Sequence, residues 1–107
     1  MSTGTTEATA DVDRPASVGV GVELTGVLVV RTGMRRSQMS LAAGATVADV
    51  VDRLAERRGP QVRRALLKGD RLRQGVVATV RSSESHERAS ADTPLAHGDR
   101  VRFEFVD

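Results

Sequence analysis

Apolar and polar positions alternate along several stretches of this chain, and one stretch between them repeats with the period of a helix. Residues 18–31 are strongly β-forming, and the continuous apolar run at 27–30 (VLVV) favours a first strand that is buried on both faces at the centre of a sheet. A Thr-Gly turn at 32–33 leads to a half-buried second strand, in which Met39 and Leu41 alternate with polar residues. These two strands are predicted to form a hairpin.

The helical stretch carries its own start and stop signals. Thr46 occupies an N-cap position, and Asp49 follows three residues later as in a capping box. Asp49 and Arg53 are spaced as an i,i+4 pair on the polar face, and Gly-Pro at 59–60 predicts a left-handed cap with the helix ending near Arg58. The apolar face repeats at i, i+3, i+4 and i+7: Val47, Val50, Val51 and Leu54.

The second half of the chain predicts shorter elements. A helical turn is expected at 61–67, a turn at 69–70, a third strand at 76–80, and at most a short edge strand within the polar segment 82–92. In the last strand Val101, Phe103 and Phe105 alternate with charged residues. The order ββαβ(β)β predicts an α+β fold, in which a mixed sheet packs on one main helix.

Length and composition limit the domain organisation. The 107 residues, 39% of them hydrophobic, support one core. Residues 1–17 are rich in Ser, Thr, Ala and acidic residues without apolar periodicity, so they are predicted to be a disordered leader to a single domain at 18–107. No apolar run could span a bilayer and no signal pattern is present, so we expect a cytoplasmic protein with no membrane partner.

Residues that could support catalysis are few. The chain has no Cys, which excludes a disulfide framework, a thiolate metal site and a cysteine nucleophile. His86 and His97 stand alone in polar segments and are interpreted as solvated loop residues rather than metal ligands. The serines at 82, 83 and 85 lack a Gly-x-Ser-x-Gly elbow and are interpreted as a flexible loop. We therefore expect no enzymatic activity, metal or cofactor.

Two segments carry a family resemblance. Residues 41–54 (LAAGATVADVVDRL), preceded by the predicted hairpin, and residues 92–101 (DTPLAHGDRV) resemble the MoaD/ThiS family of ubiquitin-like β-grasp proteins, the molybdopterin synthase small subunit and the thiamine sulfur carrier. The resemblance covers nearly all of the domain and implies a four- to five-stranded β-grasp sheet. In that family an E1-like enzyme adenylates the carrier's C-terminal glycine, which becomes a thiocarboxylate and enters the partner's active site.

The chain departs from this family at the reactive tail. It contains no Gly-Gly, and Val106 and Asp107 stand where the tail would begin. If the α-carboxyl of Asp107 were activated, its own side chain could close a five-membered anhydride, with an effective molarity of about 10⁵ M or more. We therefore expect a non-catalytic protein-binding subunit or accessory protein of a cofactor- or sulfur-related biosynthetic enzyme. A sulfur carrier activated by an E1-like enzyme is the alternative.

The predicted partner surface follows from the last strand and from the resemblance, since family members dock through the sheet face and the C-terminal strand. The partner implied is an E1-like activating enzyme or a larger synthase subunit. Alternation places Phe103 in the core and leaves Phe105 open between core and contact. The predicted partner-binding residues are Arg71, Arg73, Arg100, Arg102, Phe105, Val106 and Asp107.

Nucleic-acid binding is a less favoured alternative. Arginine pairs at 35–36, 57–58 and 63–64, together with Arg71 and Arg73, could contact phosphates. However, acidic residues are interspersed among them, the net charge is only +2, and the two Phe residues are the only aromatic side chains. A mixed, solvated surface is the preferred interpretation.

Overall fold

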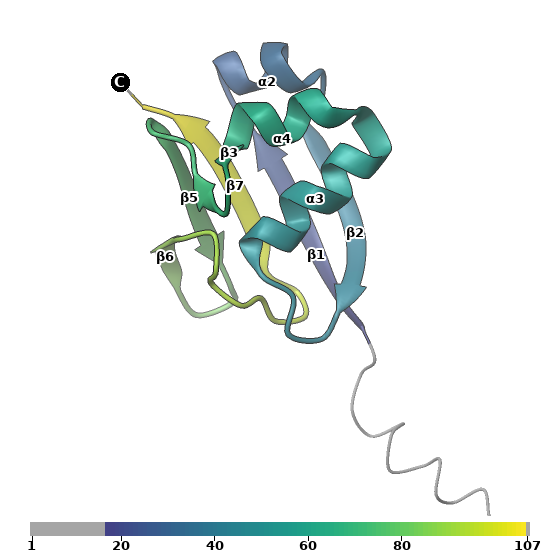
Figure 1. The fold of residues 1–107 in the computed structure, drawn as a ribbon. Helices are drawn as coiled ribbons and strands as arrows, with labels where there is room; N and C mark the ends of the chain where they lie inside the picture. The colour runs from purple at the N-terminus through teal and green to yellow at the C-terminus, as the bar shows by residue number, and fades with distance from the viewer. Residues whose placement is uncertain (1–16, 107) are drawn as a thin grey trace, which may run out of the picture.

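The computed structural model describes residues 17–106, which form a five-stranded mixed sheet with helices on one side (Figure 1). The strand order is β2-β1-β7-β5-β6; β1 and β7 are parallel and the other neighbours antiparallel. The strands are β1 (Ser17–Leu24), β2 (Arg36–Ala42), β5 (Val76–Arg81), β6 (His86–Ala89) and β7 (Arg100–Phe105). The predicted α+β class and five-stranded mixed sheet are confirmed.

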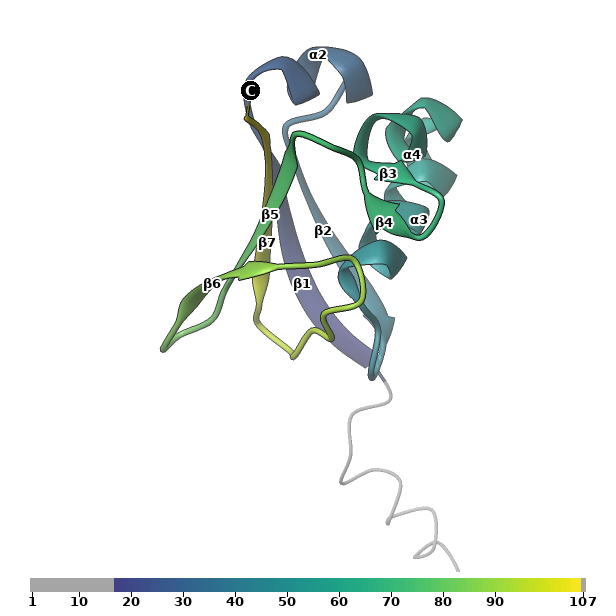
Figure 2. The same ribbon diagram turned by 60° about the vertical axis from the view of Figure 1, so that its left-hand side comes forward.

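The main helix covers one face of the sheet. α3 (Val47–Arg58) and the shorter α4 (Pro60–Leu66) lie on the same side, and the opposite face, called the open face below, carries no helix in residues 17–106 (Figure 2). The capping box is confirmed: the Asp49 N–H donates to Thr46 Oγ1, and the Thr46 N–H donates to Asp49 Oδ2 at 2.8 Å. All four predicted apolar positions of α3 are buried.

Two details predicted for α3 are wrong. Asp49 does not pair with Arg53, because the carboxylate is used in the cap; Arg53 instead lies 3.6 Å from the Glu56 carboxylate. Gly59 has φ 114° and ψ 164°, which is not a left-handed helical cap. The chain turns directly into α4, with Pro60 as its first residue, so this glycine needs an extended backbone at positive φ.

The predicted central strand at residues 27–30 is also wrong. β1 ends at Leu24, and α2 (Val27–Thr32) follows, ended by Gly33 at φ 79°. Leu28 and Thr32, four residues apart, are the buried residues of α2, whereas Val30 is 81% exposed. A short apolar run has the same appearance in a buried strand and in a helix. β1 and β2 still pair antiparallel, but a helix separates them in place of the predicted turn.

The centre of the sheet is formed by β1 and β7 instead. Every second residue of β1 points into the core: Val18, Val20, Val22 and Leu24. In the parallel register Leu24 lies opposite Phe103, which is fully buried, as strand alternation predicted. Gly19, Gly21 and Glu23 therefore lie on the open face.

Smaller elements agree with the sequence in part. The predicted turn at 69–70 is confirmed, but it joins a two-stranded ribbon, β3 (Leu67–Lys68) and β4 (Arg71–Leu72), that was not predicted. β6 is the expected short edge strand, so His86 lies in a strand rather than a loop. Of the predicted leader, residues 1–16 lie outside the described part, and Ser17 already belongs to β1. Within residues 17–106 no helix is long and apolar enough to cross a membrane.

Candidate functional site

The predicted partner-binding residues separate onto three surfaces. Arg100 and Arg102 are exposed on the open face, as predicted, and Phe105 and Val106 lie at the end of β7. Arg71 and Arg73, also predicted to bind the partner, do not lie on the open face with Arg100 and Arg102 or in the third strand, β5. They precede it, with Arg71 in the β3–β4 ribbon. Asp107 lies outside the described residues.

Strand register brings a basic cluster together on the open face. Arg81 lies opposite Arg100 on β7 and opposite His86 on β6. Two residues along, Thr79 lies between Arg102 and Arg88. All five basic residues are exposed, and we call them the basic patch: Arg81, His86, Arg88, Arg100 and Arg102.

The basic patch has little internal compensation. Like charges that face each other directly on neighbouring strands, as Arg81 and Arg100 do, destabilise a sheet. The ion pairs found among residues 17–106, Arg53–Glu56 and Arg63–Asp52, both lie on the helix side. Glu23 and Glu104 are the partly buried acidic residues of the open face. Glu23 lies opposite Arg102 in the register of β1 and β7 and offsets part of the charge at that end of the patch, whereas Arg81 and Arg100 have no acidic cross-strand neighbour.

Glycines in β1 leave room beside this patch. Gly21 forms part of a hollow of about 250 Å³, also lined by Glu23, Arg36 and Arg100. The Arg100 Nε lies 3.5 Å from the place where a Cβ on Gly21 would be. The same Cβ would lie 3.3 Å from Gln38 Nε2, so a side chain at this position would fill the space between Gln38 and Arg100.

His97 has a structural partner that the sequence did not indicate. Its Nδ1 accepts a hydrogen bond of 2.9 Å from the Gly19 N–H, and its ring lies over Gly19. The prediction of a solvated loop histidine is thus incomplete: the side chain is exposed, but it ties the loop before β7 to β1. The two residues are 78 positions apart, so only the fold brings them together.

An apolar surface surrounds the end of β7. In residues 17–106 the exposed large hydrophobic side chains are Val27 (41%), Val30 (81%) and Val106 (48%). The first two lie on α2, which packs against β7, and Figure 2 shows the end of β7 beside this helix. The Arg31 guanidinium lies 5.3 Å from the centre of the half-buried Phe105 ring. We call this set the end surface: Val27, Val30, Arg31, Phe105 and Val106.

The Phe105 ring packs against Gly75. The Val106 N–H donates to the Gly75 carbonyl at 2.7 Å, which closes the last pair between β7 and the chain before β5. A Cβ on Gly75 would lie 2.6 Å from the Phe105 ring. The alternation left open whether Phe105 is a core residue or a contact residue. In the structure it is both, because one part of the ring packs against the core and the rest is accessible.

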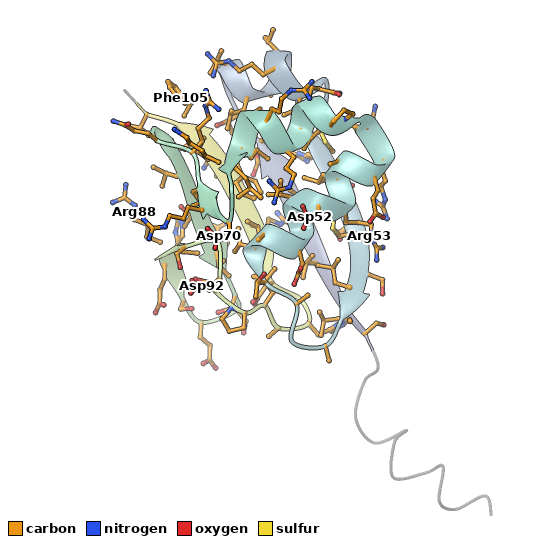
Figure 3. The ribbon with its side chains drawn as sticks, in the orientation of Figure 1. Asp52, Arg53, Asp70, Arg88, Asp92 and Phe105 are labelled. Atoms are coloured by element: carbon orange, nitrogen blue, oxygen red, sulfur yellow. The ribbon has the colours of Figure 1, made fainter. Side chains whose placement is uncertain are left out.

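Arg71 and Arg73 line separate cavities on the helix side. Arg71 borders a cleft of about 750 Å³ between the β3–β4 ribbon and edge strand β6, which Asp70, Arg88 and Asp92 also line (Figure 3). Arg88, at the edge of the sheet, therefore belongs both to the basic patch and to the rim of this cleft. Charges of both signs alternate around this cleft. Arg73 lines another hollow, and its Nη1 donates to the Arg64 carbonyl at 3.3 Å. No group of three or more His, Asp or Glu residues within 17–106 could hold a metal ion.

Two of the arginines proposed for phosphate contact, Arg57 and Arg63, are hydrogen-bonded within the molecule. Arg57 donates to the Gln38 carbonyl and Arg53 to the Ser40 carbonyl, so α3 covers the outer edge of β2. Arg63 donates to Asp52. The serines near His86 form the turn between β5 and β6, where Ser82 Oγ accepts the Ser85 N–H. These side chains have structural roles.

Comparison with known proteins identifies solved structures that share this fold. No protein-family model matches the chain, and no curated protein matches it in sequence. Solved structures do match. Small archaeal modifier protein 1 of H. volcanii is 21% identical with a TM-score of 0.64, covering 84% of this chain and 99% of its own. A putative molybdopterin converting factor subunit 1 from Pyrococcus furiosus is 22% identical with the same TM-score, covering 85% and 100%.

A third match comes from a complex. A chain of the Amycolatopsis orientalis BexX/CysO complex is 20% identical with a TM-score of 0.64, covering 82% of this chain and 96% of its own. At these identities the matches establish a shared fold. The resemblance to the β-grasp proteins of the MoaD/ThiS type is confirmed at that level.

Proposed function

We propose that this chain is a non-catalytic, protein-binding β-grasp subunit or accessory protein of a cofactor- or sulfur-related biosynthetic enzyme in the cytoplasm. The observation that carries the proposal is the end surface, where the exposed large apolar side chains of the described part gather beside the end of β7. Exposed apolar side chains that cluster, with charged residues around them, are typical of protein interaction sites. The partner would bury these side chains.

The composition of the end surface suits a docking site. Arg is among the residue types that contribute most to binding energy in interfaces, and Phe is enriched in them; Arg31 and Phe105 already contact each other. Gly75 and the Val106 hydrogen bond hold Phe105 in place before any partner binds. A preorganised aromatic side chain loses little conformational entropy on binding.

The comparisons support a protein partner without identifying it. The matching chain from Amycolatopsis orientalis was solved in a complex with another protein. By analogy, the partner of this chain is a larger synthase subunit or an E1-like activating enzyme. The basic open face, including Arg100 and Arg102, lies on the same C-terminal strand and is available to the same partner.

Co-purification tests the proposal. The tagged full chain, expressed in its native cell, should recover one partner in stoichiometric amount. The double variant Val30→Asp/Val106→Asp should lose that partner, because it places two carboxylates in the apolar contact. A matched control, Ala42→Asp/Ala43→Asp, changes the net charge equally at two exposed positions where β2 ends, away from the end surface, and should retain the partner. Recovery of free monomer alone, or equal loss in both variants, would contradict the proposal.

Sulfur transfer is the second candidate function. It is favoured by the shared fold with a putative molybdopterin converting factor subunit and a small archaeal modifier protein. The test is to incubate the chain with an E1-like enzyme, ATP and a sulfur donor and then measure its intact mass. A gain equal to one oxygen replaced by sulfur at the C-terminus would establish the carrier role, and an unchanged mass would speak against it.

A further inference from the structure

We infer that the basic patch on the open face binds an acidic segment of the partner protein, one with clustered Asp and Glu side chains. The inference rests on the proposed function, since it takes the partner to be a protein, and it names the chemistry of a second contact. Arg81 and Arg100 face each other across β5 and β7, and no carboxylate of residues 17–106 is ion-paired with either. Carboxylates of a partner would remove this repulsion.

The arginines of the patch differ from four arginines of the helix side, whose guanidinium groups are used within the molecule. On the helix side, Arg53, Arg57, Arg63 and Arg73 each donate to a carbonyl or carboxylate within the molecule. The side chains of Arg81, Arg88, Arg100 and Arg102 make no hydrogen bond or ion pair among residues 17–106, and six further arginines of this part share that property. The patch is distinguished by the strand register, which places four of these free guanidinium groups side by side on three neighbouring strands. Their guanidinium groups keep all of their donors for a ligand, and guanidinium groups bind carboxylates in bidentate geometry.

The geometry sets the size of the ligand. The patch spans three neighbouring strands at about 4.8 Å each and two rows of side chains about 7 Å apart along the strands. An extended or helical segment with three or four carboxylates on one face could contact all of it. The hollow beside Gly21 gives Arg100 space to reorient toward such a ligand.

The surroundings of the patch favour an acidic protein over a nucleic acid. The open face offers no Phe, Tyr or Trp side chain for base stacking, since Phe103 is buried and Phe105 pairs with Val76 toward the helix side. Glu23 and Glu104 flank the patch on β1 and β7. They would repel the phosphates of a nucleic acid and the carboxylates of a peptide alike, so the absence of Phe, Tyr and Trp from this face is the observation that favours a protein ligand.

Binding to defined probes tests the inference. The probes are a fluorescein-labelled twelve-residue peptide of alternating Glu and Ser and an oligothymidylate of equal charge, measured by fluorescence polarisation. The full chain should bind the peptide, with an affinity that falls about tenfold or more between low and physiological salt because screening weakens exposed charge pairs. The variant Arg81→Glu/Arg100→Glu should weaken peptide binding about tenfold or more, which corresponds to roughly 1.4 kcal/mol.

The matched control changes the net charge by the same amount, but at two positions on the helix side. Arg58→Glu/Arg64→Glu alters two exposed arginines away from the open face and should retain peptide affinity within about twofold. Equal loss in both variants would show that net charge alone drives binding and would overturn the inference. Absence of peptide binding at low salt, or tighter binding of oligothymidylate, would also overturn it. Backbone amide NMR spectra of each variant establish that the fold is retained.

These outcomes separate the inference from the proposed function. If the Arg81→Glu/Arg100→Glu variant recovers the native partner as well as the unmodified chain does, the acidic contact is wrong, and the end surface remains the docking site. If neither chain recovers a partner, the proposed function fails, whatever the peptide result.

Discussion

Gly75 combines two constraints at one residue. Its φ of 92° is disfavoured for residues with a Cβ, and that Cβ would lie 2.6 Å from the Phe105 ring. Gly75→Ala is therefore expected to lower the free energy of unfolding by about 1–3 kcal/mol from backbone strain and by a further 1–3 kcal/mol, roughly, from overpacking. Urea unfolding followed by circular dichroism measures the sum.

Gly44 is the matched control for this prediction, because its φ is 90° and no atom lies within 4 Å of its Cβ position. Gly44→Ala should show the strain alone. In a Phe105→Ala background the Gly75→Ala penalty should fall to the level of Gly44→Ala, since the ring that causes the overpacking is gone. Equal penalties for both glycines in the native background would show that the ring moves aside at no cost.

Single residues differ in how far the sequence could define them. Phe103 was predicted correctly as core, because alternation along one strand is local information. The role of Phe105 depends on Gly75 and Arg31, and that of His97 on Gly19. These contacts join residues far apart in the chain, so no local pattern predicts them. The candidate site was therefore only partly predictable. The sequence indicated that it lies on the last strand, β7, but not which residues of other elements contact that strand.

At the level of elements, α2 provides the sharpest test of the structure. Leu28 is fully buried and Val30 is 81% exposed. Leu28→Ala is expected to cost about 2–5 kcal/mol of unfolding free energy, whereas Val30→Ala should change it by no more than about 0.5 kcal/mol. A central strand at 27–30, buried on both faces, would make both substitutions costly. Chemical denaturation of the two variants therefore distinguishes helix from strand.

Elements with chemical boundary signals were predicted well, and those without them were not. Thr46 and Asp49 hydrogen-bond to each other's backbone N–H groups, and this capping signal predicted the first residue of α3 correctly. The apolar run of α2 has no side-chain cap, and its bounding residues, Gly26 and Gly33, were interpreted as part of a strand and a turn. The β3–β4 ribbon has two residues per strand, which is too short to produce a period.

At the scale of the whole molecule, one face of the sheet is stabilised by burial and the other is left charged. The core residues of β1, β5 and β7 pack against α3 and α4, and this amphipathic arrangement follows from the sequence. Which charged residues meet on the open face depends on register between β5, β6 and β7. The arginine pairs adjacent in sequence were the visible signal, but the basic patch is assembled from residues 81, 86, 88, 100 and 102.

A patch retained for binding should lower stability, and this can be tested with one substitution. Arg81→Glu replaces a repulsive cross-strand pair with an attractive one beside Arg100. It is expected to raise the free energy of unfolding by about 0.2–1 kcal/mol at low salt, with Arg81→Gln giving an intermediate value. At about 1 M salt the Debye length falls to about 3 Å, so most of the gain should disappear. Thermal unfolding at the two salt concentrations measures this difference.

The same substitution should weaken binding of the acidic peptide. If the positive charges serve binding and lower the stability of the fold, Arg81→Glu should be more stable than the unmodified chain and bind the peptide less tightly. An ordinary solvated surface predicts no such opposition between stability and binding. If Arg81→Glu destabilises the protein, or if its gain persists at high salt, repulsion between Arg81 and Arg100 is not a significant part of its energetics. The positive charge of the open face would then need no partner to explain it.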